Sequence, residues 1–304
     1  MKKRLAVWTL CFAAVCGSAQ TSAAATNVVA DYRFRRDLTS DVASAPDLTP
    51  IGPGQNCFVI DKVGTQLRNV LEFPTGDGVQ VAWTALDPLI PLDHYSIAFR
   101  FHFDGFGGYQ RLVSFDGGVA DCGLYSIGNV MTFFCGSGNT NIPFPADGYY
   151  DVVFTRASGG VVNGYINGNL ALQFTDTTAL SVIGVNESLR FFRDNECPAA
   201  CNENRSGTVS RIRLYDDALT ADQVTALETP LATTTTMLEP TCGDANESDT
   251  ITAADALAAL RSSVGTGCCR ITCDVNSSGS VTASDALAIL KRAVGQGVTL
   301  TCPF

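Results

Sequence analysis

The stretch that decides the architecture of the C-terminal region is written twice, as DANESDTITAAD at 244–255 and as DVNSSGSVTASD at 274–285. Each copy puts oxygen-bearing side chains at places 1, 3, 5, 9 and 12 of a twelve-residue loop, with an aliphatic residue at place 8. EF-hand loops surround a calcium ion with this spacing, and place 7 adds its backbone carbonyl. We therefore expect two calcium sites, with the ligands Asp244, Asn246, Ser248, Thr250, Thr252 and Asp255, and Asp274, Asn276, Ser278, Ser280, Thr282 and Asp285.

Both loops depart from the usual pattern in ways that predict weak binding. Place 12 is Asp rather than Glu, so the last carboxylate has a shorter reach, and Ser at place 5 leaves two carboxylates per site. Affinity follows ligand charge, so dissociation constants on the order of 10⁻⁵ to 10⁻³ M are expected. Gly279 suits the sharp turn at place 6 of the second loop, whereas Asp249 stands there in the first. The second loop is therefore expected to be the better formed.

A helical pattern follows each loop. The apolar residues form one stripe per helix, and Gly265 and Gly295 mark the helix ends. Helices this short are not stable alone in water, so we expect the two stripes to be buried against each other. No amphipathic helix precedes either loop, so these are not complete EF-hands. The expected stripes are Leu257, Leu260 and Val264, and Leu287, Leu290 and Val294.

This paired loop-helix unit, with Asp at place 12, resembles the type I dockerin over residues 244–294. The resemblance implies a small all-α module that requires calcium to fold and that docks into a cohesin-like partner on a scaffold or cell-surface protein. Places 10 and 11, which help to select the partner in that family, are here Ala253-Ala254 and Ala283-Ser284. The competing interpretation is a pair of Asx- and Ser-rich turns before two Ala-rich helices.

The N-terminus has the pattern of an export signal. A basic start at 2–4 precedes an apolar run that is too short to span a membrane, and three alanines at 23–25 offer a cleavage site. We expect a signal peptide over 1–25, no membrane span, and a secreted protein that is extracellular or on the cell surface. A lipid-anchored start at Cys16 is the competing interpretation, and Val15 argues against it. The formal net charge of −10 disfavours nucleic acid and anionic lipid as partners.

Twelve cysteines are encoded, and the ten beyond the signal peptide predict disulfides formed in an oxidising compartment. Cys57 and one member of the adjacent pair at 268–269 have no evident partner. Zinc is the rival interpretation for 268–273, but the spacing lacks two CxxC units and no His lies near. The expected pairs are Cys122 with Cys135, Cys197 with Cys201, Cys242 with Cys302, and Cys273 with either Cys268 or Cys269.

Between residues 26 and 228 the pattern is almost wholly β. The segment 96–103 alternates strictly, with Ile97, Phe99, Phe101 and Phe103 on one face. Asn167-Gly168 predicts a tight hairpin, and Thr220 with Gln223 predicts a capping box that opens a short helix ending at Leu227. Many short strands with Gly, Asn and Asp turns predict a mainly β fold, an antiparallel β-sandwich of the jelly-roll kind. Further strands are expected at 151–155, 161–165, 170–174, 189–193 and 208–215.

Four segments in this region resemble successive strands of the LamG-like, concanavalin A-type jelly rolls of secreted bacterial proteins. They are found, in order, at 29–34, 149–156, 164–168 and 209–224. The resemblance implies two curved sheets over 26–228 and a general function, the recognition of a glycan or a surface protein. Residues 229–241 are rich in Thr and Pro and predict a linker to the small module at 242–304.

The sequence gives no support for catalysis. Related β-glucanases carry Glu-x-Asp-x-x-Glu on one strand, which does not occur here. No Ser or Cys has the context of a nucleophile. His102, with Arg100, is interpreted as part of a solvated sheet face. Trp83, Tyr109 and Tyr125 are interpreted as packing aromatics rather than as residues that stack on sugars.

The sequence therefore predicts a secreted, non-enzymatic binding protein with a LamG-like sandwich and a calcium-dependent, dockerin-like tail. Two alternatives stay open. One is a divergent polysaccharide-degrading enzyme, or an accessory protein, recruited to a dockerin–cohesin complex. The other is a structural cell-surface protein whose calcium loops only stabilise its C-terminus.

Overall fold

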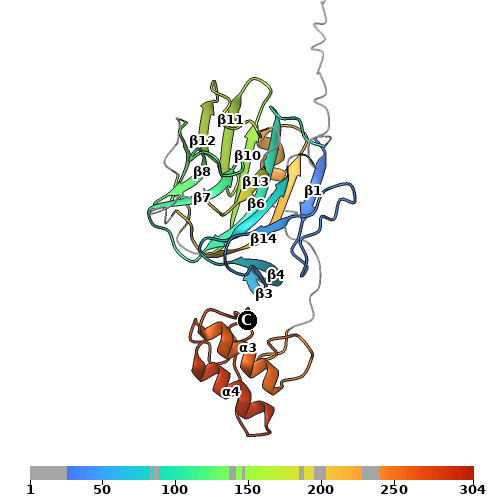
Figure 1. Ribbon diagram of the computed structural model, residues 1–304, viewed down its shortest axis with the longest axis vertical. Coiled ribbons are helices and arrows are strands. Elements are labelled where there is room, and N and C mark those ends of the chain that lie inside the picture. The colour runs from blue at the N-terminus through green and yellow to red at the C-terminus, as the bar shows by residue number, and fades with distance from the viewer. Residues whose placement is uncertain are drawn as a thin grey trace, which may run out of the picture.

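The computed structural model describes residues 26–82, 84, 89–136, 142–145, 148–184, 188–194, 203–227 and 240–304. In these ranges, two antiparallel β-sheets face each other and a small helical module lies at one end of them (Figure 1). Four expectations fall outside the described residues: the signal peptide at 1–25, Trp83, the Cys197–Cys201 pair and nearly all of the linker at 229–241.

The larger sheet has the strand order β12-β11-β10-β6-β14-β4-β3, and β1 pairs with β14 beyond the end of β4. β11 and β12 turn at Asn167-Gly168, where φ values of 48° and 75° are those that the Asn-Gly signal predicts. The strands expected in this sheet lie within two residues of the observed bounds. These bounds are β1 Val28–Tyr32, β3 Cys57–Val63, β4 Gln66–Phe73, β6 Tyr95–Phe103, β10 Tyr150–Arg156, β11 Val161–Ile166, β12 Asn169–Thr175 and β14 Gly207–Tyr215.

The smaller sheet has the order β2-β5-β13-β7-β8-β9. A disulfide joins Cys122, before β8, to Cys135, after β9, as predicted. The strands of this sheet are β2 Thr49–Ile51, β5 Gly78–Ala82, β7 Tyr109–Ser114, β8 Gly123–Ile127, β9 Val130–Phe134 and β13 Ser188–Phe191.

A phenylalanine-rich core fills the space between the two sheets. The alternation predicted for β6 places Ile97, Phe99, Phe101 and Phe103 in this core, each with almost no solvent exposure. Rings from both sheets contact one another: the centroids of Phe99 in β6 and Phe191 in β13 lie 6.1 Å apart. Burial of many large aromatic side chains gives the sandwich a hydrophobic core of its own.

The outer face of the larger sheet carries the short helix α2, Ala221–Leu227. Its predicted capping box is present, because the Thr220 N–H donates to Gln223 Oε1 (2.7 Å) and the Gln223 N–H donates to Thr220 Oγ1 (3.3 Å). Val224 packs with Tyr215 in a small cluster beneath the helix. The helix therefore covers part of the face that lies opposite the core.

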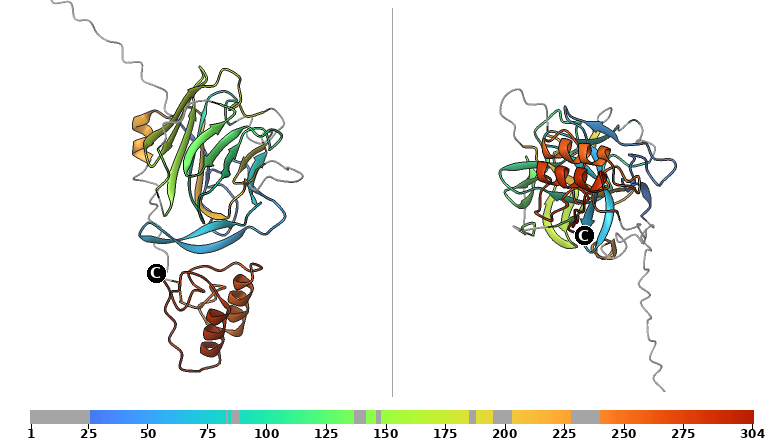
Figure 2. Two further views of the ribbon diagram at one scale, coloured as in Figure 1. Left: turned by 90° about the vertical axis from the view of Figure 1, so that its left-hand side faces the viewer. Right: turned by 90° about the horizontal axis from the view of Figure 1, so that it is seen from below.

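The C-terminal module holds α3, Ala253–Ser263, and α4, Ala283–Ala293, which lie side by side (Figure 2). The predicted disulfide between Cys242 and Cys302 joins the two ends of the module, and Cys273 pairs with Cys269. None of the helices in the described ranges is long and apolar enough to cross a membrane.

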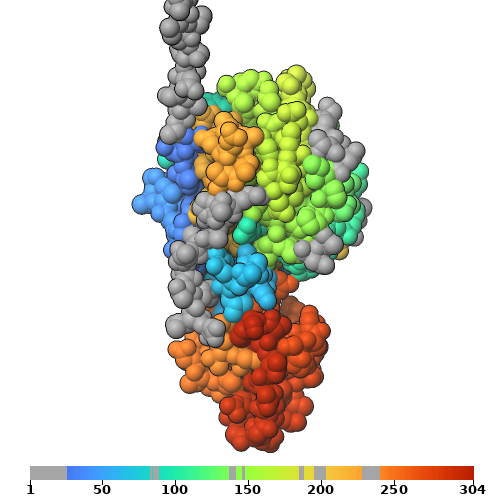
Figure 3. All heavy atoms as spheres, turned by 180° about the vertical axis from the view of Figure 1, so that it is seen from behind, coloured from blue at the N-terminus to red at the C-terminus, as the bar shows by residue number. Residues whose placement is uncertain are grey.

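The module lies directly beneath the hairpin of β3 and β4, and the atoms of the two parts are in contact in Figure 3. Cys57 at the start of β3, for which the sequence suggests no partner, forms a disulfide with Cys268 of the module, 211 residues away. The sandwich and the module are therefore joined covalently at their contact as well as through the chain.

Candidate metal centre and its surroundings

The first repeated loop gathers side-chain oxygens at its centre. Asp244, at place 1, is nearly fully buried, and its Oδ1 and Oδ2 accept hydrogen bonds from the N–H groups of Ser248 (3.0 Å) and Asp249 (2.7 Å). Asn246 Oδ1 accepts from the same Ser248 N–H at 3.1 Å. The Ser248 hydroxyl donates to the carbonyl of Thr250 at 3.1 Å. Places 1, 3, 5 and 7 are thus brought together as the spacing predicts.

Asp255, at place 12, closes the first loop and is fully buried. Its Oδ1 accepts from the N–H groups of Ala245 (3.0 Å) and Asn246 (3.1 Å). Its Oδ2 accepts from the N–H (2.8 Å) and the hydroxyl (2.7 Å) of Thr252, which is the N-cap of α3. The place 9 hydroxyl is therefore engaged with the last carboxylate and with the start of the helix, in a capping box that the sequence analysis did not identify.

The second loop repeats most of this geometry, and the main difference is at place 12. Asp274 accepts from the N–H groups of Ser278 and Gly279, both at 2.8 Å, and Asn276 Oδ1 accepts from Ser278 at 2.9 Å. The Ser278 hydroxyl donates to the carbonyl of Ser280 at 3.1 Å. Asp285 Oδ2 accepts from the N–H and hydroxyl of Thr282, but Asp285 Oδ1 is buried and finds no hydrogen-bond partner among the residues that the structure describes.

The backbone at place 6 takes the sharp turn that the sequence predicts. Asp249 has a φ of 63° and Gly279 one of 88°. Glycine adopts this left-handed conformation without a Cβ clash, whereas Asp adopts it at some cost. The geometry and the unpartnered oxygen of Asp285 together suit a hard cation with oxygen ligands, and they suit it better in the second loop.

The apolar stripes after the loops are exposed, so the expectation that they bury each other is wrong. Leu257 and Leu287 are 48% and 52% exposed, and Leu260, Leu290, Val264 and Val294 are exposed as well. The helices pack instead through Ala256, Ala259, Ala286 and Ile289. Both sets of residues recur at helical spacing, and the alanines allow the closer approach, so the leucines are left outside. They line a groove of about 340 Å³ between α3 and α4.

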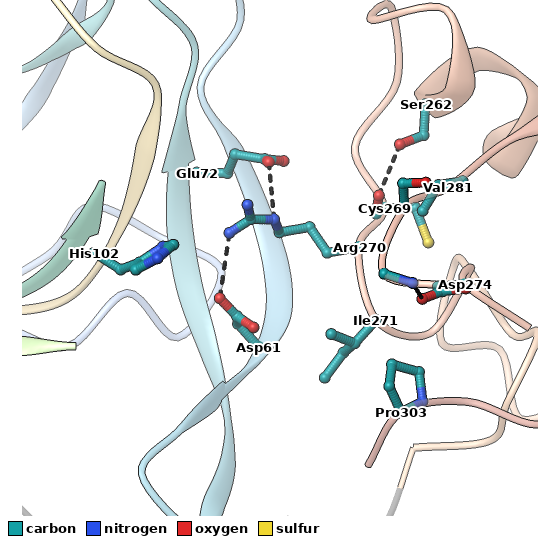
Figure 4. Close-up of a pocket in the computed structure, with 12 residues that line it drawn as sticks. Asp61, Glu72, His102, Ser262, Cys269, Arg270, Ile271, Asp274, Val281 and Pro303 are labelled. Carbon is teal, nitrogen blue, oxygen red and sulfur yellow. Dashed lines mark hydrogen bonds and ion pairs between the residues drawn. The ribbon is translucent and has the colours of Figure 1, made fainter. Parts of the chain in front are cut away.

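The contact between module and sandwich centres on Arg270, which reaches into a cluster of carboxylates on the sandwich (Figure 4). Its Nη2 lies 2.7 Å from Asp104 Oδ1, its Nε 3.2 Å from Glu72 Oε1 and its Nη1 3.3 Å from Asp61 Oδ2. Tyr149 supports this cluster because its hydroxyl donates to Asp61 Oδ2 at 2.8 Å. The role of Arg270 could not be predicted from the sequence, since a single arginine outside any motif carries no signal.

Charge in this cluster changes the pKa values of its members. Burial lowers the pKa of Arg270, but the attraction of Glu72, Asp104 and Asp61 outweighs this effect and raises the pKa above its ordinary value. Burial raises the pKa of Glu72, and Asp104 and Asp61 raise it further, against the effect of Arg270. Burial raises the pKa of Asp104, but the positive charge of Arg270 and the hydrogen bonds from Ser206 and Arg270 outweigh burial, so this pKa is lowered.

A second polar cluster lies in the smaller sheet. Carboxylate oxygens of Asp121, Asp194 and Glu203 lie within 4.8 Å of one another. Arg111 is fully buried, donates to Asp194 Oδ1 from Nε (3.0 Å) and Nη2 (2.8 Å), and lies 4.2 Å above the ring of Tyr125. Arg111 supplies the positive charge that these carboxylates need, so we interpret the cluster as a structural ion-pair network.

The aromatic and basic residues of the sandwich have mostly structural roles. Tyr125 is fully buried in β8, as expected for a packing aromatic, and Tyr109 at the start of β7 packs edge-on against it. Arg100 forms a bidentate ion pair with Asp151. His102 packs on Tyr149, with ring centroids 5.8 Å apart. The face expected to be solvated is therefore ion-paired and partly covered, in part because the module lies against it.

The comparisons with known proteins agree with this fold. Residues 75–225 match the family model of the concanavalin A-like lectin/glucanases superfamily, which supports a LamG-like jelly roll. No curated protein matches the chain.

Two solved structures illustrate the likeness. Domain 4 of AbnA, a GH43 extracellular arabinanase from Geobacillus stearothermophilus, solved with arabinotriose, has a TM-score of 0.51 and 18% identity over 67% of this chain and 98% of that one. The binding domain of botulinum neurotoxin DC, solved with rat synaptotagmin II, has a TM-score of 0.49 and 15% identity over 68% of this chain and 52% of that one. At these identities the AbnA domain shows a shared fold and nothing further, and the chain spans about half of the toxin domain.

Proposed function

We propose that this chain is a secreted, non-catalytic binding protein. Its LamG-like sandwich recognises a glycan or a surface protein, and its dockerin-like tail, ordered by calcium, docks onto a cohesin-like or surface partner. The observation that carries the proposal is the exposed apolar groove between α3 and α4. An apolar surface left open on a small module marks an interaction site.

Calcium is supported by the charge of the two loops. Asp244, Asp255, Asp274 and Asp285 are nearly or fully buried. Within the described residues, no Lys, Arg or His forms an ion pair with any of them. Buried carboxylates without a compensating charge are costly. A bound calcium ion supplies two positive charges to each pair of carboxylates and takes the remaining oxygens of the loop as ligands.

The groove indicates the chemistry of the docking partner. Its floor is alanine and its walls are leucine, while Arg261 and Lys291 stand exposed one helical turn after the groove residues Leu257 and Leu287. This basic rim contrasts with the acidic chain as a whole. The best complement is an apolar surface rimmed by carboxylates. A second copy of this module is disfavoured because it would bring two basic rims together.

A glycan is the first ligand to test for the sandwich. The AbnA domain with the same fold was solved with arabinotriose, and concave β-sandwich surfaces serve many binding functions. Among the described residues, four of the five buried carboxylates of the sandwich are engaged by arginines, namely Asp31, Asp151, Asp176 and Asp194. The fifth, Asp77, accepts a hydrogen bond from the N–H of Gly54 and lies in no pair of acids. This supports a binding role over catalysis by paired acids.

The groove is tested with the full chain against a panel of immobilised cohesin domains, in calcium and in chelator. We expect calcium-dependent binding that weakens at least about 100-fold in Leu257→Glu/Leu287→Glu, because buried charge at an interface centre costs several kcal/mol. Gln296→Glu/Thr299→Glu, which adds the same charge at two exposed positions of the same module, is the control and should bind normally. Binding that is unchanged both by chelator and by the groove variant would contradict the docking role. Turnover of a polysaccharide by the full chain would contradict the non-catalytic role.

A further inference from the structure

The segment that joins the module to the sandwich also leads into the second loop. Cys268 forms the disulfide to Cys57 of β3, and Cys269 pairs with Cys273. Arg270 follows Cys268 and Cys269, inside the loop that the Cys269–Cys273 bridge closes, and four residues before Asp274, which is place 1 of the second loop. One short turn therefore carries both the contact with the sandwich and the first ligand of a candidate cation site.

The backbone of Arg270 sets the position of Asp274 directly. The carbonyl oxygen of Arg270 accepts hydrogen bonds from the N–H groups of Cys273 (3.0 Å) and Asp274 (3.2 Å). The Cys269–Cys273 disulfide closes the same turn covalently. Asp274 can therefore turn its carboxylate into the loop only as the conformation at Arg270 allows.

The side chain of Arg270 fixes the same conformation through its contacts with the sandwich. Its guanidinium is shared among Asp61, Glu72 and Asp104, and it is about one quarter exposed. Partly buried charge-assisted contacts with three carboxylates are much stronger than exposed ion pairs. Among the described residues, the other ion pair across this contact joins Arg36 to Glu247 of the first loop. Arg36 is more exposed than Arg270, so this pair is expected to contribute little.

The second loop also borders the sandwich. A cavity of about 430 Å³ lies at the contact, with Asp61, Glu72 and His102 on the sandwich side and Asp274 and Gly279 on the loop side (Figure 4). No ligand residue of the first loop lines this cavity. The sandwich therefore borders a predicted ligand, Asp274, in the second loop, whereas its ion pair with the first loop is made by Glu247, which is not a predicted ligand.

We infer that Arg270 is a positioning residue for the second cation site, so that docking of the module on the sandwich and calcium binding in this loop are coupled. The inference rests on the proposed calcium function. The sandwich, through Asp61, Glu72 and Asp104, prearranges Asp274 and so raises the affinity of the second loop. By linkage, calcium in the second loop strengthens the hold of the module on the sandwich by the same factor.

The test is a calcium titration of the full-length chain in which each loop reports separately. The amide signals of Asp249 and Gly279, both at place 6, follow the first and the second loop by nuclear magnetic resonance. In Arg270→Gln we expect the second-loop affinity to fall at least about 5-fold, with less than a twofold change in the first loop. Arg270→Lys, which keeps the charge, should recover part of the loss.

Arg36→Gln is the matched control, since it removes an arginine from the same contact, and it should change neither loop. The disulfide between Cys57 and Cys268 keeps the module tethered in every variant. Equal losses in both loops would show a merely structural role for Arg270, and unchanged affinities would show no coupling, so either result overturns the inference while the calcium proposal stands. If neither loop of the unmodified chain responds to calcium, the proposed function and this inference both fail.

Discussion

The sandwich and the C-terminal module are stabilised by different means. The sandwich encloses a large aromatic core between two sheets, whereas the buried apolar residues of the module are few and small. The module turns its leucines outward and relies on disulfides and, as we propose, on calcium. Domains of this size rarely bury enough apolar surface to fold without such cross-links or metals. The leucines that we propose for partner binding do not stabilise the core of the module, so the disulfides and the proposed calcium ions have to stabilise it instead.

Removal of the loop carboxylates should have the largest effect, and it should destabilise the module while leaving the sandwich unchanged. At the tight end of the expected range, a dissociation constant of about 10⁻⁵ M, millimolar calcium is at about 100 times that constant, and each bound ion contributes about 3 kcal/mol to the stability of the module. Asp244→Ala with Asp274→Ala should therefore lower its free energy of unfolding by about 5 kcal/mol and leave the sandwich unchanged. Urea unfolding separates the two parts, because Trp83 reports the sandwich and the module has no tryptophan. Unchanged helical circular dichroism in the variant would refute the proposed role of the loops.

The disulfide between the ends of the module should have the next largest effect. Cys242 and Cys302 are separated by 60 residues, and a loop of that length corresponds to about 4 kcal/mol of stabilisation. Cys242→Ser/Cys302→Ser should therefore unfold the module at low urea. Cys122→Ser/Cys135→Ser is the matched control in the sandwich, where 13 residues separate the cysteines and the core keeps the fold. Similar unfolding midpoints for the module with and without its disulfide would contradict the account.

Neighbouring residues on α4 sharpen the comparison. Ile289 is fully buried between the helices, while Leu290 lies in the exposed groove. Ile289→Ala should cost about 3 kcal/mol through lost burial and an added cavity, but Leu290→Ala should cost less than about 1 kcal/mol. Urea unfolding in calcium measures both. The opposite ranking would place the core of the module on the leucine face.

The smallest effect should come from pH at the contact of the two parts. Arg270 helps to lower the folded-state pKa of Asp104 below its ordinary value of 3.8. The contribution of Asp104 is therefore present above pH 3.8 and lost as pH falls through the lowered value. Glu72 acts in the opposite direction, because its raised pKa favours the protonated form and its contribution fades as pH rises above 4.5. The protection factors of the β3–β4 amides, which are corrected for the intrinsic pH dependence of exchange, should thus fall below pH 3.8, and Asp104→Asn should abolish that acid-dependent change.

The local parts of the structure could be predicted from the sequence. Places 1 and 3 of each loop accept hydrogen bonds from the N–H of place 5, because ligand spacing and turn conformation are fixed within twelve residues. The role of these residues as calcium ligands stays a prediction. The alternation in β6 and the hairpin at Asn167-Gly168 depend on neighbouring residues in the same way. Near neighbours in sequence were also enough to pair Cys122 with Cys135.

Features that depend on distant contacts could not be predicted. The partner of Cys57 lies 211 residues away, beside a second cysteine of equal chemistry, so spacing did not reveal the pair. An apolar stripe such as Leu257 and Leu260 recurs at helical spacing both when it packs inside its own module and when it binds another protein, so the spacing does not distinguish the two. Arg270 belongs to no pattern, and its role depends on carboxylates from β3, β4 and the end of β6.

Hydrogen exchange of the unmodified full-length chain, in millimolar calcium and in chelator, tests the central claim most directly. We predict that removing calcium speeds exchange at least about 10-fold in the loops and helices of 244–295 and leaves β6 and β10 unchanged. Equal protection of 244–295 with and without calcium would contradict the account.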